Sequence, residues 1–136
     1  MRLPPDLERK VLELAAVTAV VQLPRPAPRN EAEFQGQVIA LARRHSWYVA
    51  HFRGVRVQRA DGSVHYETPV QADGRGFLDL VLARERIIWA EVKTDRGRLT
   101  AGQKVWVERL RAAGQEVYVW RPRDFREIER ILGGKP

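Results

Sequence analysis

The sequence contains no cysteine among its 136 residues. Disulfide bonds, zinc sites built on thiolates and cysteine nucleophiles are therefore excluded. It also lacks any apolar run approaching the roughly 20 residues that a membrane-spanning helix needs, so we expect no membrane partner. The opening residues, MRLPPDLERK, lack the apolar core and the small-residue cleavage site of a signal peptide. We therefore expect a cytoplasmic protein.

Acidic residues are in deficit. The chain carries 24 Lys and Arg residues against 17 Asp and Glu residues, which gives a formal net charge of +7 and a pI near 10.5. Such a surface attracts polyanions, and nucleic acid is the first partner class to consider. A basic protein without such a partner is the alternative on charge alone. The hydrophobic content of 44% is ordinary for a globular domain.

Prolines divide the chain into two parts. The stretch PRPAPR at residues 24–29 excludes helix and central strand, and it predicts a stiff linker. Residues 1–29 are then an N-terminal helix followed by this linker, with Leu7, Val11 and Leu14 along one side of the helix. A single domain is expected over residues 30–136.

Capping and alternation patterns predict the elements of this domain. Asn30 with Glu33 favours a capped helix from about Glu31 to His45. A strand is expected within residues 46–54, followed by a hairpin arm and loop over 55–75 that turns at Asp61-Gly62. Two more strands are expected at 76–83 and 87–93, followed by a helix to about Ala113 that Thr100 and Gln103 cap. The last two elements are a strand over EVYVWRP that Pro122 ends and a helix capped by Asp124 and Glu127. This order predicts an α/β fold with a mixed central sheet flanked by helices.

Two carboxylates and a lysine lie inside these otherwise apolar strands. The three-residue turn at 84–86 sets an antiparallel register that places Asp79 opposite Glu91. Lys93 lies two residues beyond Glu91 and shares its face of the strand. A turn one residue longer would move Asp79 to the other face. The register therefore predicts that all three groups converge.

Facing carboxylates repel each other, and burial raises the cost. Either one carboxyl stays protonated, or a cation lies between them. Mg²⁺ takes oxygen ligands from one or two carboxylates together with phosphate and water, and such an ion assists phosphodiester hydrolysis. Lys93 beside it could hold the water or counter the negative charge of the transition state. The alternative is a solvated Glu-x-Lys pair on an exposed strand.

The stretch Asp79…Glu91-Val92-Lys93 resembles the D…(D/E)-x-K signature of the PD-(D/E)XK nuclease superfamily. A longer string is similar to the virus-type replication-repair nuclease (VRR-NUC) domain over about residues 30–132. That string comprises Glu31-x-x-x-Gln35, GFLDLVL, Arg98-Leu99-Thr100-x-x-Gln103, Trp106, Leu110 and an ending from Gly114 to Pro122. Leu78 stands where the superfamily name has proline. The resemblance implies a restriction-endonuclease-like αβββαβ core, with the N-terminal helix as an addition to it.

The resemblance also implies a role for each matching residue. The groups that would bind Mg²⁺ or Mn²⁺ are Asp79, Glu91, the main-chain carbonyl of Val92, and Glu31 directly or through water. Lys93 would be the catalytic lysine, and Gln103 would orient groups at the site. Glu31 and Gln103 also have plain structural roles as a helix N-terminal acid and a capping residue.

Basic residues outside this cluster are candidate nucleic-acid contacts. Arg98 matches the family string and would contact a phosphate, and Lys104 is a further candidate. Arg53, Arg56 and Arg59 on the arm could follow a phosphate backbone, or they could protect an exposed strand from aggregation. We expect Trp89 and Trp106 to belong to the core.

Two functions from different classes are consistent with these patterns. The first is a metal-dependent DNA endonuclease, and the resemblance implies a homodimer that acts on branched DNA, such as four-way junctions, in replication, repair or recombination. The second is a non-catalytic, basic nucleic-acid-binding module, in which the carboxylates are structural or form a protonated pair. Sensitivity to a chelator and to Asp79→Ala distinguishes the two.

Overall fold

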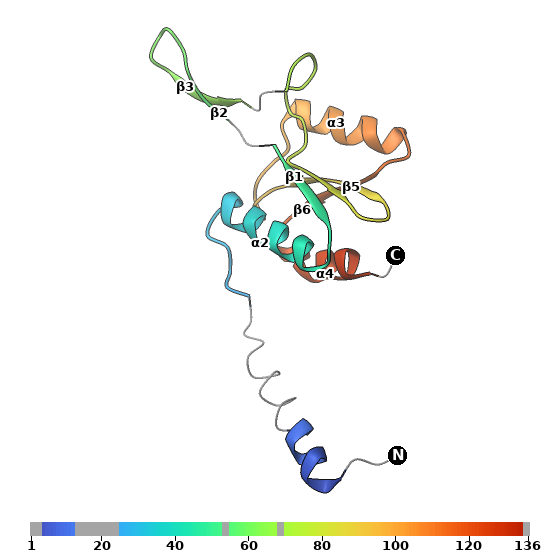
Figure 1. The fold of residues 1–136 in the computed structure, drawn as a ribbon. Coiled ribbons are helices and arrows are strands. Elements are labelled where there is room, and N and C mark those ends of the chain that lie inside the picture. The colour runs from blue at the N-terminus through green and yellow to red at the C-terminus, as the bar shows by residue number, and fades with distance from the viewer. Residues whose placement is uncertain (1–3, 13–24, 53–54, 68–69, 135–136) are drawn as a thin grey trace.

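The computed structural model describes residues 4–12, 25–52, 55–67 and 70–134 (Figure 1). Its elements in chain order are α2 (Glu31–Arg44), β1 (Tyr48–His51), β2 (Val55–Gln58), β3 (Val64–Glu67), β4 (Leu80–Ala83), β5 (Ile87–Val92), α3 (Ala101–Ala112), β6 (Glu116–Trp120), the 3₁₀ turn η1 (Pro122–Asp124) and α4 (Phe125–Gly133). A four-stranded mixed sheet has the order β1-β4-β5-β6, and β2 pairs only with β3. The fold is therefore mixed α/β, and its order without the β2–β3 hairpin is the predicted one.

The N-terminal helix is present over residues 5–12, and every one of these residues is exposed. Leu7 and Val11, the predicted apolar stripe, are 43% and 52% exposed, and Leu14 lies outside the described residues. Residues 25–28 form neither helix nor strand, as the proline-rich sequence predicts. None of the described helices is long and apolar enough to cross a membrane.

The first helix of the domain, α2, begins as predicted but with a different second contact. The Asn30 side chain accepts a hydrogen bond from the Glu33 N–H at 2.9 Å. The Glu33 carboxylate does not return to the Asn30 N–H as a capping box requires. It accepts the N–H of Arg29 at 2.7 Å and pairs with the Arg29 guanidinium. The cap predicted at Asn30 is therefore confirmed, but Glu33 does not complete a reciprocal pair with it, because the arginine offers the carboxylate a charged partner as well as a main-chain donor.

The hairpin of β4 and β5 has the predicted register. Leu80 pairs with Ala90 and Ala83 pairs with Ile87, across the three-residue turn at 84–86. The predicted strand bounds were too wide, because β4 begins at Leu80 and residues 76–79 lie outside it. The ladder therefore stops one pair before Asp79 and Glu91. The segment before β4 requires a glycine at position 76, where φ is +79° and a Cβ would lie 2.5 Å from backbone atoms of Gly102 and Gln103.

Strand β6 pairs in parallel with β5, and this pairing brings Trp120 beside Val92 and Lys93. Val92 is the partner of Trp120, and the Lys93 N–H donates to the Trp120 carbonyl at 2.9 Å. The last helix is not capped as predicted. The Asp124 carboxylate accepts the N–H of Arg121 at 2.9 Å and so caps η1, while Glu127 pairs with Arg130. The 3₁₀ turn η1, which begins at Pro122, thus lies between the Arg121 N–H that Asp124 caps and the start of α4.

Helices cover both faces of the sheet (Figure 1). The larger core joins α2 and α4 to one face through residues such as Phe34, Leu82 and Ile128. The smaller core joins α3 to the other face through Val107 and Val117, and Leu78 lies fully buried between them. Leucine at the position that the superfamily name gives to proline therefore contributes apolar packing. Trp89 and Trp106 pack against this smaller core, as predicted.

The arm predicted over residues 55–75 contains the hairpin of β2 and β3. Val55 pairs with Glu67 and Gln58 pairs with Val64. The turn follows the predicted Asp61-Gly62, with φ of +86° at Gly62 and the Asp61 carboxylate accepting the Ser63 N–H at 2.8 Å. Aspartate and glycine supply the side-chain acceptor and the left-handed backbone that this turn needs.

Candidate functional site

Five side chains that the sequence singles out meet near the end of β5. They are Glu31 in the first turn of α2, Asp79 just before β4, Glu91 in β5, Lys93 just after β5 and Gln103 in the first turn of α3. Two helices and the central hairpin therefore each supply part of the cluster. These side chains come from segments that are tens of residues apart in the sequence. A solvated Glu-x-Lys pair on one exposed strand would not bring such distant segments together.

Glu91 is at the centre of this cluster, and its side chain is fully buried. Its Oε1 accepts a hydrogen bond from the Gln103 amide at 2.8 Å and lies 3.7 Å from the Lys93 ammonium nitrogen. Its other oxygen, Oε2, is buried and has no hydrogen-bond partner among the described residues. Leaving a buried carboxylate oxygen unpaired is costly, so this atom calls for a proton or a cation.

The Asp79 side chain provides a hydrogen-bond acceptor to β5 just beyond the end of the β4–β5 ladder. Its Oδ2 accepts the N–H of Val92 at 2.9 Å. The Val92 N–H points away from β6, because the next N–H along β5, that of Lys93, is the one that donates to β6. A carboxylate thus satisfies a main-chain donor that β4 would otherwise have paired. The second Asp79 oxygen is left for other interactions.

The main-chain carbonyl of Val92 lies on the same side of the strand as the Asp79 carboxylate. In a trans peptide the carbonyl of one residue points opposite to the N–H of the next. Because the Lys93 N–H points to Trp120 in β6, the Val92 carbonyl points away from β6 and toward Asp79. Val92 is fully buried, so its backbone has a fixed direction. Two of the oxygen donors predicted for a metal, the Asp79 carboxylate and the Val92 carbonyl, therefore lie on one side of β5.

Gln103 serves the helix and the site together. Its Oε1 accepts the Thr100 N–H at 2.8 Å and completes the predicted capping box, while its amide nitrogen donates to Glu91. The start of α3 is held against the loop before β4 by contact between two glycines. A Cβ on Gly102 would lie 2.8 Å from the Arg75 carbonyl. The glycines thus set the distance between Gln103 and the carboxylates.

The electrostatic environment favours a proton on Glu91 in the absence of a cation. Burial first, then the negative charge of Asp79 and the hydrogen bond that a protonated Glu91 makes to it, raise the pKa of Glu91 to about 9, against the opposing effect of Lys93. Burial also raises the pKa of Glu31, which Lys93 lowers and Asp79 raises. An ionised Glu91 leaves Oε2 unpaired, whereas a protonated Glu91 shares its proton with Asp79.

We expect Glu91→Gln to remove a pH dependence of stability in the metal-free protein. Folded Glu91 keeps its proton to a higher pH than unfolded Glu91, whose pKa is 4.5. The folded state therefore binds more protons between pH 4.5 and about 9, and the free energy of unfolding falls as pH rises, by up to about 1.4 kcal/mol per pH unit. Urea unfolding in EDTA at pH 6, 7 and 8 measures both slopes. Equal slopes for wild type and variant would show that Glu91 is already ionised.

The predicted nucleic-acid contacts lie outside this cluster. Arg59, Arg98 and Lys104 are exposed. Arg53 and the side chain of Arg56 lie outside the described residues. Within the described part, no hydrogen bond or ion pair joins Arg59, Arg98 or Lys104 to the carboxylates. Their proposed role therefore depends on a ligand large enough to extend beyond the cluster.

No protein-family model, curated protein or solved structure matches this chain. The site must therefore be interpreted from its own chemistry. Among the described residues, no set of three or more His, Asp or Glu side chains is arranged to hold a metal ion. The candidate donor set is two carboxylates and a main-chain carbonyl, with Glu31 nearby.

One functional contact was missed in the sequence. An Arg121 nitrogen, Nη1, donates to the carbonyls of Thr94 and Gly97, both at 2.6 Å. This arginine therefore fixes the turn that follows Lys93. Parallel pairing of the strands around Glu91 and Val119 would have placed Arg121 beside Lys93, but nothing in the local sequence announces the contact.

Proposed function

We propose that this protein is a divalent-metal-dependent endonuclease that hydrolyses phosphodiester bonds in DNA. The observation that carries the proposal is the buried Oε2 of Glu91, which has no hydrogen-bond partner among the described residues. It belongs to a carboxyl group that neighbours Asp79 and whose other oxygen, Oε1, faces the Lys93 ammonium group. A pair of facing carboxylates is unfavourable without a proton or a cation. The formal net charge of +7 favours a polyanionic substrate.

The donor set fits Mg²⁺ or Mn²⁺. Hard divalent ions take oxygen ligands, and Mg²⁺ commonly uses one or two carboxylates and keeps several waters. Asp79, Glu91 and the Val92 carbonyl would hold the ion, and Glu31 would act directly or through water. When bound, such an ion supplies charge that polarises the phosphate and lowers the pKa of the attacking water. It would also give Glu91 Oε2 the partner that it lacks.

The side chains of this chain position and neutralise the reacting groups. Lys93 keeps 11% of its side chain exposed, and its ammonium group has only one polar contact to the described residues, a long one to Glu91 at 3.7 Å. Its ammonium group therefore has donors left for a phosphate oxygen or for the attacking water. Gln103 fixes the rotamer of Glu91, and Val92 fixes Asp79. Rigid carboxylates beside a donor at the developing negative charge are the requirement for electrostatic catalysis.

The reaction adds water across one bridging P–O bond. The water oxygen forms a bond to phosphorus, and the bond from phosphorus to the bridging oxygen of one nucleotide breaks. The leaving oxygen takes a proton and becomes a hydroxyl, and the other product carries a terminal phosphate. Water is the only co-substrate and no redox partner is needed, which is consistent with a site made of oxygen donors, an amide and a lysine.

The proposal extends to the fold family. The order α2-β1-β4-β5-α3-β6 supports a restriction-endonuclease-like αβββαβ core, and the match of Glu31, Asp79, Glu91, Lys93 and Gln103 to the family string supports a VRR-NUC domain over about residues 30–132. In this form of the proposal, the protein acts as a homodimer on branched DNA. Two-fold symmetry would place two such sites on one branched substrate.

A cleavage assay tests the proposal. The protein is incubated with a four-way junction, a flap and a linear duplex of matched sequence, with Mg²⁺, Mn²⁺ or EDTA. We expect cleavage that requires metal, and a preference for the branched forms if the finer proposal holds. Binding without cleavage under either metal would instead support the non-catalytic module. Light scattering of the same samples decides whether the active form is a dimer.

A further inference from the structure

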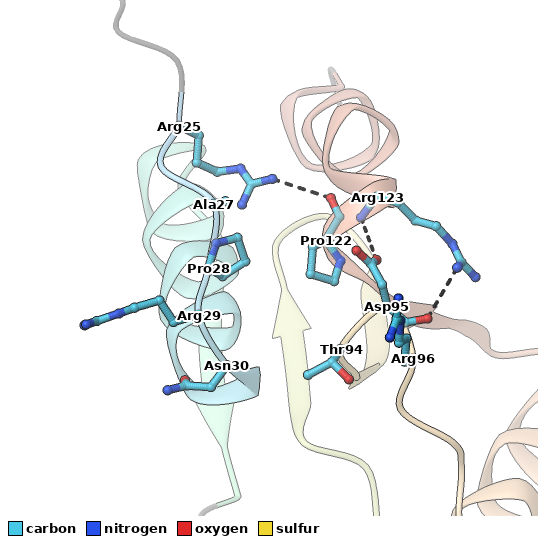
Figure 2. Close-up of a pocket in the computed structure, with 10 residues that line it drawn as sticks. All are labelled: Arg25, Ala27, Pro28, Arg29, Asn30, Thr94, Asp95, Arg96, Pro122 and Arg123. Atoms are coloured by element: carbon cyan, nitrogen blue, oxygen red, sulfur yellow. Dashed lines mark hydrogen bonds between the residues drawn. The ribbon is translucent and has the colours of Figure 1, made fainter.

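A pocket of about 560 Å³ adjoins the carboxylate cluster, and four arginines are among the residues that line it (Figure 2). Three segments form its walls: residues 25–30 before α2, residues 94–96 after β5, and residues 122–123 after β6. Four arginines and a single carboxylate, that of Asp95, are in this lining. The pocket is therefore suited to an anion.

Two of the four arginines have guanidinium groups with donors to spare. Arg96 is exposed and has no hydrogen bond or ion pair to any described residue. Within the described part of the chain, Arg123 donates from its guanidinium only to the Asp95 carbonyl, at 3.4 Å (Figure 2). The other two are held by the protein, since Arg29 pairs with Glu33 and Arg25 lies 3.8 Å from the Phe125 ring centroid. Spare guanidinium donors match the planar spread of phosphate oxygens.

The wall that carries Arg96 is a fixed turn. The Gly97 N–H donates to the Thr94 carbonyl at 3.2 Å, and Arg121 donates to the carbonyls at both ends of this turn. The Asp95 carboxylate accepts the Arg123 N–H at 3.1 Å and so ties the turn to the opposite wall (Figure 2). Arg96 and Arg123 are therefore presented from two segments that hydrogen bonds hold together, which lowers the entropy cost of binding.

The pocket and the cluster adjoin along the chain at two points. Asn30 lines the pocket, and the next residue, Glu31, belongs to the cluster. Thr94 lines the pocket, and the residue before it, Lys93, belongs to the cluster. Consecutive residues are only about 3.8 Å apart between Cα atoms. An extended polyanion at Lys93 would therefore reach the pocket without leaving the surface.

We infer that this pocket binds a phosphate group of the same nucleic-acid strand whose scissile phosphate lies at Lys93. The inference rests on the proposed nuclease function for the placement of that strand, although phosphate binding by the arginines can be measured without cleavage. The phosphate can be a terminal monoester or an internal diester. Both present the oxygens that Arg96 and Arg123 would bind.

The double variant Arg96→Ala/Arg123→Ala tests the inference against the matched control Arg43→Ala/Arg44→Ala. The control also removes two positive charges, but from the last turn of the 14-residue α2. That turn lies roughly 20 Å from the first turn of α2, which adjoins the pocket. Fluorescence anisotropy in EDTA measures binding of one labelled oligonucleotide with and without a terminal phosphate, at several salt concentrations. Neither variant removes a residue of the carboxylate cluster or of the core.

We expect the pocket variant to bind about 10- to 100-fold more weakly than the control, since two charge-assisted hydrogen-bonding groups are lost. The slope of log affinity against log salt should fall by about 1 relative to the control, because one phosphate contact is removed. A difference seen only with the terminally phosphorylated strand assigns a monoester to the pocket, and a difference with both strands assigns an internal phosphate. Equal affinities for pocket and control variants would overturn the inference.

Cleavage kinetics separate this inference from the proposed function. If the protein is a nuclease, the pocket variant should raise KM by a similar factor and leave kcat within about twofold, because the cluster is intact. Unchanged KM in an active enzyme would reject the pocket and leave the nuclease in place. Loss of binding in the pocket variant, with no cleavage by the wild type, would keep the pocket and reject the nuclease.

Discussion

Lys93→Ala is expected to lower kcat for DNA cleavage by roughly 10²–10³-fold, the loss typical of removing one donor at the developing charge. The Lys93 ammonium group is the cation nearest Glu91, and its 3.7 Å contact is too long for a strong hydrogen bond. Its charge is therefore available to the substrate. Single-turnover cleavage in Mn²⁺ measures the chemical step without product release.

Lys93→Met separates this role from packing. Methionine keeps an unbranched apolar stem where 9% of the lysine residue is exposed, and it removes the charge. We expect both variants to bind Mn²⁺ and to unfold near the wild-type temperature. Lys10→Ala, an exposed lysine on the N-terminal helix, is the charge-matched control. Wild-type kcat in Lys93→Met would remove the lysine from the proposed mechanism.

Asp79→Asn and Asp79→Ala should differ in their effects on the stability of the metal-free protein. Asparagine keeps an oxygen that accepts the Val92 N–H and removes the charge that repels Glu91, so stability near neutral pH should be equal to wild type or higher. Alanine leaves the N–H of fully buried Val92 unpaired, which costs about 1–3 kcal/mol. Urea unfolding in EDTA at pH 7.5 measures both.

Both substitutions should nevertheless abolish the metal site. Each removes a charged oxygen ligand, and we expect Mn²⁺ affinity to fall by at least about 100-fold, more than is typical when an outer partner is lost. Titration calorimetry with Mn²⁺ is the measurement, with the Arg43→Ala/Arg44→Ala protein as control. Retained Mn²⁺ heat in Asp79→Asn would place the ion elsewhere. Equal stability of the Asn and Ala variants would mean that the Val92 contact contributes little.

Much of the site could be predicted because its geometry is set by short-range rules. A three-residue turn determines the register of β4 and β5, and the structure has that register. Thr100 and Gln103 form the predicted capping box, since both partners lie within one helical turn. The prediction failed where a side chain competed with the backbone. Asp79 bonds the Val92 N–H and replaces the strand that alternation had extended to residue 76.

The arginine pocket could not be predicted in the same way. Its walls come from residues 25–30, 94–96 and 122–123, which no local pattern relates. The parallel pairing of β5 with β6 and the packing of α2 on the sheet bring them together. Arg98 was singled out in this region because it matches the family string, whereas Arg96 and Arg123 line the pocket. A family resemblance identifies residues by their order in the sequence, whereas the lining of a pocket depends on where residues lie in the folded structure.

By itself the sequence determined the helix starts, the central hairpin register and the placement of Asp79 and Glu91 at the end of that hairpin. Each depends on neighbours within one helical turn or across one short loop, so composition and spacing are sufficient. Only the tertiary structure decided that Gln103 reaches Glu91, that Asp79 ends the β4–β5 ladder, and that Arg121 holds the turn after Lys93. These contacts join segments that are distant in the sequence. The distance between such segments in space depends on how the helices pack on the sheet, which local sequence patterns do not specify.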